Sequence, residues 1–239
     1  MHPVWKYIDS GPNIGAYNMA ADEELLARAQ AGEAVPVLRF YGWNPPTVSL
    51  GRFQHIESAV NADVCRRHGF DIVRRITGGR AVLHHQELTY SITARVDNPL
   101  FPSTVLGTYK VIATGLLAGL HNLGISAEMV SRGGRHAALV EKKVKDPACF
   151  SSPSWYEILV NGKKIIGSAQ RRMRGAFLQH GSILLDYDPG LEAEVIPGRC
   201  SGDVVTSIKR ELGRDVPLDM VKQAFVKGFS EEFGIKFKA

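Results

Sequence analysis

The residue best suited to covalent chemistry is Cys149, which lies in the run DPACFSSPSWYE. A cysteine in a polar segment rich in proline and serine is not expected to be packed like a core residue. The run NGKKIIGSAQRR follows closely and brings lysines that could lower the pKa of the thiol. Because the thiolate is the reactive form of cysteine, a nearby cation favours nucleophilic chemistry. We therefore predict that Cys149 is a nucleophile.

A pair of lysines follows this thiol on a predicted strand. Lys163 and Lys164 are adjacent, so the alternation of a strand points one inward and the other toward solvent. The residues after them are small or apolar and would be half buried: Ile165, Ile166, Gly167, Ser168 and Ala169. A lysine on the side of these residues would lie close to the interior of the sheet.

A second candidate segment runs from Arg74 to Ser91 with the sequence RRITGGRAVLHHQELTYS. Its arginines leave a predicted strand and meet Gly78 and Gly79. Backbone N–H groups at these glycines could approach a carboxylate, phosphate or thioester oxygen, and the arginines would add charge-assisted hydrogen bonds. A Gly-Gly pair also suits a tight hairpin turn, because glycine readily adopts positive φ. From the spacing of the residues alone, we favour the hairpin turn over an anion-binding loop.

Three histidines are candidate acids or bases. His84 and His85 end the predicted strand Ala81–Leu83, where neighbouring side chains point to opposite sides, so at most one of them faces a site. His180 lies in the run LQHGS. For each of the three, a structural role is more common than a catalytic one. No HExxH motif or comparable spacing is present, so we predict no metal site.

The composition is that of an ordinary globular protein with a mildly basic surface. The 239 residues carry a formal net charge of +5, and the chain is long enough for the core of a single domain. A solvated surface is the simplest interpretation of this charge. If the charge serves binding, acidic proteins are better partners than nucleic acid, because no nucleic-acid motif accompanies it.

The cysteines and the first residues indicate where the protein works. Cys65, Cys149 and Cys200 form neither a disulfide framework nor a zinc pattern, which is typical of a reducing cytosol. The opening run MHPVWKYIDSG lacks the apolar core of a signal peptide, and no stretch is apolar over the length of a membrane span. We expect a cytoplasmic protein with no membrane contact.

Periodicity places these motifs on predicted elements. Apolar spacing predicts helices at Asn18–Ala29, Ala59–Arg67, Thr104–Leu123 and Leu218–Phe233. Strand-type runs lie at Val37–Tyr41, Thr47–Leu50, Asp71–Arg75, Leu88–Ala94 and Ser182–Leu185. Asn161-Gly162, between strands at 156–160 and 163–166, is typical of a type I′ hairpin turn. The aperiodic stretch Arg132–Pro153 is interpreted as a mobile functional loop. Together these elements indicate a mixed sheet with helices packed against it.

In chain order, the motifs resemble the biotin/lipoate-ligase catalytic superfamily. The likeness is carried by RFYGWNPPTVSLGRFQ, RRITGGRAVLHHQELTYS, CFSSPSWYEILVNGKKIIGSAQRR and LQHGSILLD, and it extends roughly from Trp5 to Phe233. This resemblance implies an α+β fold with a mixed, mostly antiparallel sheet flanked by helices. It also implies a single catalytic domain over residues 1–239, without a separate C-terminal accessory domain.

Within that superfamily the chain is most similar to the cysteine-dependent octanoyltransferases. Those enzymes carry a reactive cysteine just before PSWYE and a lysine three residues before GSA, which here are Cys149 and Lys164. The resemblance therefore turns Lys164 inward and Lys163 outward. It implies octanoyl-acyl carrier protein as the donor. The implied acceptor is the H protein of the glycine cleavage system or another lipoyl domain.

The reaction implied by this resemblance has two steps and needs no cofactor. Cys149 attacks the donor thioester while Lys164, as an ammonium, stabilises the thiolate and favours the oxyanion. The acceptor lysine then takes the octanoyl group as an amide, with His84 as one candidate base. Exchange between thioesters is nearly isoenergetic, so no ATP is required. The predicted acyl- and substrate-binding residues are Tyr41, Trp43, Arg75, Gly78, Gly79, Arg80, His84, Ser168, Ala169 and His180.

Three alternatives remain open at this point. ATP-dependent lipoate ligases of the superfamily resemble RRxSGGGAVxHD followed by Gly-Asn, whereas this chain has Arg80, His85 and Glu87-Leu88 at the corresponding positions. These departures argue against nucleotide binding and therefore against a ligase. An octanoyl amidotransferase acting between lipoyl-domain proteins would use the same cysteine chemistry. A non-catalytic module that binds carrier proteins would need neither Cys149 nor Lys164.

Overall fold

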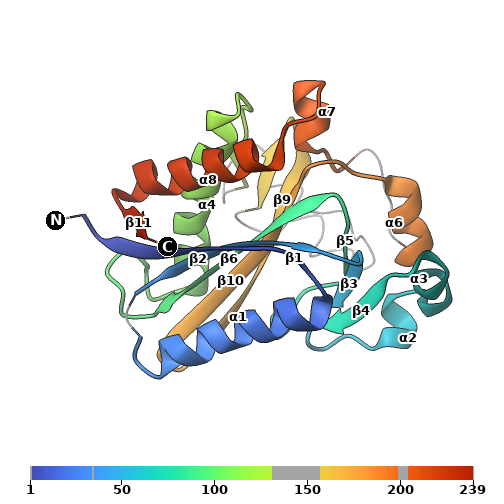
Figure 1. The fold of residues 1–239 in the computed structure, drawn as a ribbon, viewed down its shortest axis with the longest axis horizontal. Helices are drawn as coiled ribbons and strands as arrows, with labels where there is room; N and C mark the ends of the chain where they lie inside the picture. The colour runs from blue at the N-terminus through green and yellow to red at the C-terminus, as the bar shows by residue number, and fades with distance from the viewer. Residues whose placement is uncertain (1, 34, 131–156, 199–203, 239) are drawn as a thin grey trace.

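The computed structural model describes residues 2–33, 35–130, 157–198 and 204–238. An eight-stranded sheet has the order β11-β1-β2-β6-β10-β9-β8-β7, and a three-stranded sheet has the order β4-β3-β5 (Figure 1). The larger sheet contains β1 (Val4–Asn13), β2 (Val37–Trp43), β6 (Glu87–Arg95), β7 (Glu128–Met129), β8 (Ile158–Val160), β9 (Lys163–Met173), β10 (Ala176–Leu184) and β11 (Lys236–Lys238). The smaller sheet contains β3 (Thr47–Leu50), β4 (Asp71–Arg74) and β5 (Val82–His84).

The larger sheet is mixed and mostly antiparallel, which confirms the predicted fold class. Strand β1 runs parallel to both β11 and β2. Each neighbouring pair from β2 to β7 is antiparallel. Helix α1 (Gly15–Gln30) makes the crossover from β1 to the parallel strand β2, as a parallel connection requires.

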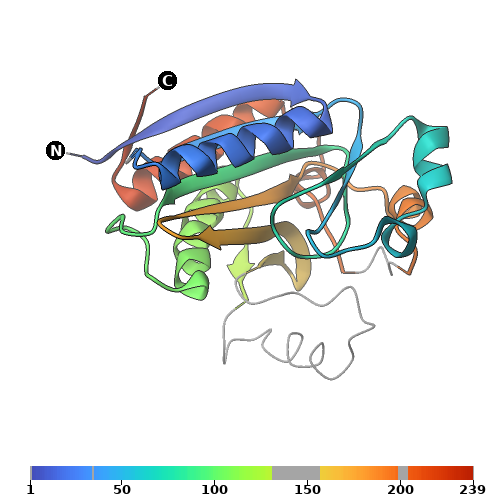
Figure 2. The ribbon, with the colours of Figure 1, turned by 90° about the horizontal axis from the view of Figure 1, so that it is seen from below.

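Helices cover the two faces of this sheet differently. Helices α4 (Val105–Asn122) and α8 (Leu218–Phe233) pack together over one face, and α1 lies on the other, which Figure 2 views from the α1 side. The α4 and α8 face is the main apolar core, where Leu38 and Phe40 of β2 are fully buried. The alternate residues of β2, Arg39 and Tyr41, therefore point toward α1.

The smaller sheet has a core of its own. Strands β3 and β5 pack apolar side chains against α2 (Ile56–Ala59), α3 (Ala62–His68) and α6 (Pro189–Val195). Helix α7 (Ile208–Leu212) precedes α8 in the chain. In the part of the chain that is described, no helix is long and apolar enough to cross a membrane.

Most predicted elements are present, but some of their bounds are wrong and several elements were not predicted. The predicted helix Ala59–Arg67 corresponds to α3, which begins only at Ala62, because the side chain of Asn61 caps its start by accepting from the N–H of Val64; Ala59 is the last residue of the preceding α2. The predicted strands at Ser182–Leu185 and 163–166 are parts of the longer β10 and β9, and β1, β7, β11, α2, α6 and α7 were not predicted. The predicted loop Arg132–Pro153 lies outside the described residues.

The predicted hairpin turn is confirmed by its backbone angles. Asn161 has φ 50° and Gly162 has φ 78°, so both central residues have the positive φ of a type I′ turn. This turn joins β8 to β9 and fixes the register that brings Leu159 opposite Lys164. The hairpin thereby determines which lysine of the pair faces inward.

Candidate active site

A cavity of about 330 Å³ lies between the α1 side of the larger sheet and the smaller sheet. This volume is within the range of small-molecule sites. Ten predicted site residues line it: Tyr41, Trp43, Arg75, Gly79, Arg80, His84, Lys164, Ser168, Ala169 and His180. Gly78 does not line it, and Cys149 lies outside the described residues. The structure thus brings together side chains from distant segments of the chain.

Lys164 reaches the cavity from the start of β9, while Lys163 is exposed. Its backbone is held on both sides, since its N–H donates to the carbonyl of Val204 at 2.8 Å and its carbonyl accepts from the N–H of Thr206 at 2.9 Å. Its ammonium donates to Oε1 of Glu157 at 2.7 Å. Glu157 is buried, with 8% of its side chain exposed, so this ion pair has a fixed position.

Gly167 provides the space that the Lys164 side chain occupies. A Cβ atom at Gly167 would lie 2.6 Å from Cε and 2.8 Å from Nζ of Lys164. Both distances are shorter than a van der Waals contact, so any side chain at Gly167 would displace the ammonium. The glycine of the GSA motif is therefore explained by the position of the lysine three residues before it.

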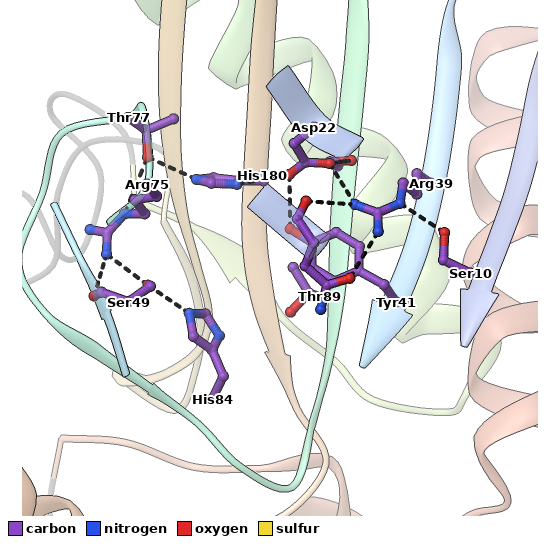
Figure 3. Close-up of polar contacts among 12 residues, drawn as sticks. Ser10, Asp22, Arg39, Tyr41, Ser49, Arg75, Thr77, His84, Thr89 and His180 are labelled. Atoms are coloured by element: carbon purple, nitrogen blue, oxygen red, sulfur yellow. Dashed lines mark hydrogen bonds and ion pairs between the residues drawn. The ribbon is translucent and has the colours of Figure 1, made fainter. Parts of the chain in front are cut away.

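A buried ionic cluster supports the α1 side of the cavity (Figure 3). Nη1 of Arg39 donates to Asp22 at 2.8 Å, and both side chains are almost completely buried. Asp22 also accepts hydrogen bonds from Tyr41, at 2.9 Å, and from Ser91, at 2.8 Å. Nδ1 of His180 lies 3.2 Å from the same carboxylate. Asp22 therefore fixes two cavity residues, Tyr41 and His180.

The pKa values in this cluster follow from burial and charge. Burial alone would raise the pKa of Asp22, but the hydrogen bond from His180 and the charge of Arg39 outweigh it and leave the pKa lowered. Burial lowers the pKa of His180, and Asp22 only partly opposes this effect. Burial, with the charge of Asp22, raises the pKa of Tyr41 well above its usual value. At neutral pH the cluster thus contains an ionised Asp22 beside a neutral His180.

Arg75 donates hydrogen bonds to β3 and to the loop in which it lies. Its Nε donates to Oγ1 of Thr77 at 3.2 Å, and its Nη1 donates to the carbonyl and hydroxyl oxygens of Ser49 at 2.8 and 2.9 Å. Its Nη2 donates to the carbonyls of Gly78 and Arg80 at 3.0 and 2.7 Å. These bonds use all five donors of a guanidinium. Arg75 therefore supports the Gly-Gly loop and β3 while it lines the cavity, and its predicted contact with a substrate stays a prediction.

The Gly-Gly loop is also a tight turn, but only one glycine needs its flexibility. Gly79 has φ 94°, which favours glycine, and Gly78 is not among the glycines with positive φ. A Cβ atom on Gly79 would lie 2.9 Å from Nη2 of Arg75. The turn and the buried arginine are therefore matched to each other.

Comparison with known proteins places this site in a family. The family described as the lipoyl protein ligase A/B catalytic domain matches residues 15–230. The chain belongs to this family. It is 42% identical to the octanoyltransferase LipM of Geobacillus kaustophilus (strain HTA426) and 40% identical to that of Bacillus subtilis (strain 168). Each alignment covers 97% of this chain and 87% of the relative.

Solved structures agree with this membership of the ligase A/B catalytic family. A crystal structure of lipoate-protein ligase A bound with ATP has a TM-score of 0.80 and 26% identity, covering 100% of this chain and 88% of that chain. A structure from T. acidophilum with bound lipoic acid has a TM-score of 0.78, with the same identity and coverage. The superfamily and fold predicted from the sequence are therefore confirmed.

In this member of the ligase A/B family, a second histidine is held by a carboxylate. Nδ1 of His84 lies 2.9 Å from Oε1 of Glu87, which is only 1% exposed. The Trp43 ring stacks on His84 with centroids 4.1 Å apart, and its Nε1 donates to Thr89 at 2.7 Å. Burial would raise the pKa of Glu87, but the charge of His84 outweighs it and leaves the pKa lowered. As predicted from alternation, His84 lines the cavity and His85 does not.

Sequence reasoning missed several residues of this family site. Asp22, Ser49 and Glu157 hold or line the cavity, yet none was a candidate. Asp22 could have been found, because it lies on the same face of α1 as the buried Met19 and Leu26. A carboxylate in a row of buried apolar residues indicates that a partner is buried with it, because charged side chains are rarely buried unpaired. Ser49, inside a short apolar strand, carried no comparable signal.

Among the described residues, Cys65 offers a second candidate thiol. Cys65 is buried in α3, and burial raises the pKa of its thiol, which makes it unreactive. Across the described ranges, no group of three His, Cys, Asp or Glu side chains is placed to hold a metal ion.

Proposed function

We propose that this protein is an octanoyltransferase that carries its acyl group on Cys149. The donor is octanoyl-acyl carrier protein, and the acceptor is a lysine of a lipoyl-domain protein, with the H protein of glycine cleavage as the first candidate. The setting is the cytoplasm. The observation that carries the proposal is the inward Lys164 at a 330 Å³ cavity, in a chain about 40% identical to octanoyltransferases over nearly its whole length.

Lys164 supplies positive charge where a thiolate or an oxyanion would form. Lowering a cysteine pKa from about 8.5 to near 7 requires on the order of 2 kcal/mol, which a cation in a partly buried site can provide. The ion pair with Glu157 keeps the ammonium in one place, at 2.7 Å, and offsets part of its charge. Lys164 and Glu157 therefore act as one unit in this proposal.

The acyl group occupies the cavity, with its chain beside Tyr41 and Trp43. The ring of Tyr41 is held by Asp22, and that of Trp43 stacks on His84, so both walls are rigid. Ser168 and Ala169 line the cavity from β9. Rigid walls lower the entropic cost of ordering a flexible chain.

A transfer assay tests the donor and the acceptor together. The protein is incubated with octanoyl-acyl carrier protein and unmodified H protein without ATP, and the mass of the H protein is measured. We expect one octanoyl group on the H protein, and none with Cys149→Ser. Product formed only from octanoyl-H protein as the donor would instead make the protein an amidotransferase.

The ATP-dependent ligase alternative is tested by a parallel assay with the same acceptor protein. One structural relative is a lipoate-protein ligase A bound with ATP, so free lipoate or octanoate with ATP is the matched challenge. We expect neither acid to be transferred, because Arg80 stands at the cavity where those ligases have a glycine. Transfer that requires ATP would contradict the proposed octanoyltransferase.

A further inference from the structure

An exposed phenylalanine lies on the segment that connects β3 to α2. Phe53 is 80% exposed, the largest value among the exposed large apolar side chains of the described residues. Single apolar side chains are ordinary on a protein surface, so exposure alone does not indicate a function. What distinguishes Phe53 is the loop that presents it, residues 51–54, which we name the Phe53 loop.

The Phe53 loop has a fixed shape because one arginine ties its backbone together. Nη1 of Arg74 donates to three of its carbonyl oxygens, at 3.0, 3.2 and 2.7 Å, which belong to Gly51, Arg52 and Gln54. The loop also closes on itself, since the N–H of Gln54 donates to the carbonyl of Gly51 and the N–H of Gly51 donates to the Gln54 side chain, both at 3.0 Å. None of these bonds uses the side chain of Phe53. A partner that covered this ring would therefore pay little entropy for ordering the backbone.

The Phe53 loop also lies directly against the lining of the cavity. The N–H of Arg52 donates to the carbonyl of Thr77 at 2.9 Å. A Cβ atom on Gly51 would lie 1.9 Å from the carbonyl oxygen of Gly79, so the two backbones are in contact and leave no space for a side chain. Gly79 lines the cavity, whereas Phe53 does not. The exposed ring is therefore presented one loop outside the cavity wall.

Positive charge accompanies the exposed ring. Cζ of Arg52 lies 5.5 Å from the centroid of the Phe53 ring, and Arg74, which ties the loop, is exposed as well. The loop contains no acidic residue, and the first one after it is Glu57 of α2. Aromatic side chains and arginines are enriched at protein interfaces. The two arginines favour a partner that presents carboxylates.

We propose that the Phe53 loop is the docking surface for the acyl carrier protein of the donor, an inference that rests on the proposed octanoyltransferase function. Phe53 is covered by an apolar patch of the carrier protein, and Arg52 faces its carboxylates. Acyl carrier proteins are acidic, which suits the charge of the loop.

The position of Phe53 favours the donor over the acceptor. The acyl group of the donor lies at the end of a long pantetheine arm, so the protein body stays outside the site that its thioester enters. An acceptor lysine has only its own side chain to reach the thioester, so its domain must dock at the cavity itself. A ring presented one loop outside the cavity wall therefore fits the carrier protein.

The test compares two donors that carry the same thioester. Octanoyl-acyl carrier protein offers the loop a protein, whereas octanoyl-pantetheine supplies the thioester without one. The rate of octanoyl loading is measured by intact mass at low donor concentration. We expect Phe53→Ala and Arg52→Glu to load about tenfold more slowly from the carrier protein, the size of an interface hot spot, and at the wild-type rate from octanoyl-pantetheine. Added salt should narrow the deficit of Arg52→Glu, because it screens exposed charges.

A binding measurement and two control variants complete the test. The Kd of the carrier protein without its acyl group, measured by titration, should rise about tenfold in Phe53→Ala. Val4→Ala and Lys236→Glu are the controls, because both residues are exposed and lie on β1 and β11, away from β3 and α2 (Figure 1). Both controls should bind and load as the wild type does.

The outcomes separate this inference from the proposed function. A wild-type protein that does not load from octanoyl-acyl carrier protein contradicts the octanoyltransferase itself. Wild-type binding and loading by Phe53→Ala and Arg52→Glu overturn the docking surface and leave the function intact. Equal slowing with both donors also overturns it, because the loop would then act on the cavity. If only the transfer from the loaded enzyme to H protein slows, the loop serves the acceptor and its assignment to the donor is wrong.

Discussion

The ammonium of Lys164 lies 2.7 Å from the buried carboxylate of Glu157 at the edge of the cavity. Lys164 places a positive charge at this edge and Glu157 places a negative one. Substituting one partner therefore shifts the local charge in the direction opposite to substituting the other. Removing the lysine leaves a buried negative charge, and neutralising the glutamate leaves an ammonium without its main counter-charge. If both act on the same thiol, their substitutions must have opposite effects on its reactivity.

Lys164→Ala should therefore slow alkylation of Cys149 by iodoacetamide near pH 7, and Glu157→Gln should accelerate it. A thiol pKa change of about one unit corresponds to roughly tenfold in thiolate fraction below the pKa. The rate is followed for the Cys149 peptide by mass spectrometry across a pH series. Lys163→Ala, its exposed neighbour, is the matched control and should react as the wild type does. Equal slowing by both pair substitutions would show a purely structural role.

Gly167→Ala should lower transfer activity by displacing Lys164. The added Cβ would lie 2.6 Å from Cε of the lysine, and a misplacement of about 1 Å can cost on the order of 10²-fold in rate. Because the displaced atoms are the far end of a flexible side chain, we expect little change in the free energy of unfolding. Steady-state rates of single and double variants check the cause. If Gly167→Ala reduces the rate as much in a Lys164→Ala background as in the wild type, the effect does not pass through the lysine.

The pKa of His180 predicts a loss of stability on mild acidification. Burial lowers this pKa from its ordinary value of 6.5, with Arg75 and His84 adding to the effect and Asp22 opposing it. The unfolded chain therefore binds a proton at a higher pH than the folded one, and stability falls as the pH drops below 6.5 toward the folded pKa. The lowered pKa of Asp22 acts only below its ordinary value of 3.8, outside this window.

Urea unfolding at several pH values between about 7.5 and 5 measures this effect, with the pH range set by the ordinary histidine pKa. We expect His180→Gln to flatten the decline of unfolding free energy. His121→Gln removes an exposed histidine from α4 and serves as the control. A decline as steep in His180→Gln as in the wild type would assign the proton uptake to other groups.

Asp22→Ala should be severely destabilising because it leaves Arg39 as a buried cation without its carboxylate. Breaking one partner of a buried ion pair typically costs about 3–5 kcal/mol. Denaturant unfolding measures the loss. Asp63→Ala, which breaks the exposed pair with Arg66, is the comparison and should have little effect. Similar small losses for both variants would mean that the Asp22 cluster does not stabilise the fold.

Local sequence signals predicted the elements that depend on local physics. The helix at Leu218–Phe233 has the predicted bounds, and Gly69 ends α3 in the left-handed conformation expected of a C-cap. The hairpin turn at Asn161-Gly162 also follows from its own residues. Strand β1 was missed because its burial alternates irregularly and its partners, β2 and β11, are distant in the chain.

The site was predictable only in part, because its hydrogen-bond partners come from separate segments. Motif resemblance identified Lys164, and strand alternation indicated that only one of His84 and His85 would face a site. The carboxylates beside Lys164 and His84 could not be assigned from spacing. The hydrogen bonds of Arg75 could not be predicted, because a sequence shows its charge but does not show which oxygens of β3 and of its own loop accept from it. The role of Cys149 stays a prediction.

The most direct test of the account is the intact mass of the protein after incubation with octanoyl-acyl carrier protein in the absence of ATP. The account predicts a mass increase of one octanoyl group, mapped to Cys149 by peptide analysis and released when unmodified H protein is added. Cys149→Ser should form no labile adduct that passes to the acceptor. A wild-type protein that forms no adduct, or one that carries it on a residue other than Cys149, would contradict the central claim.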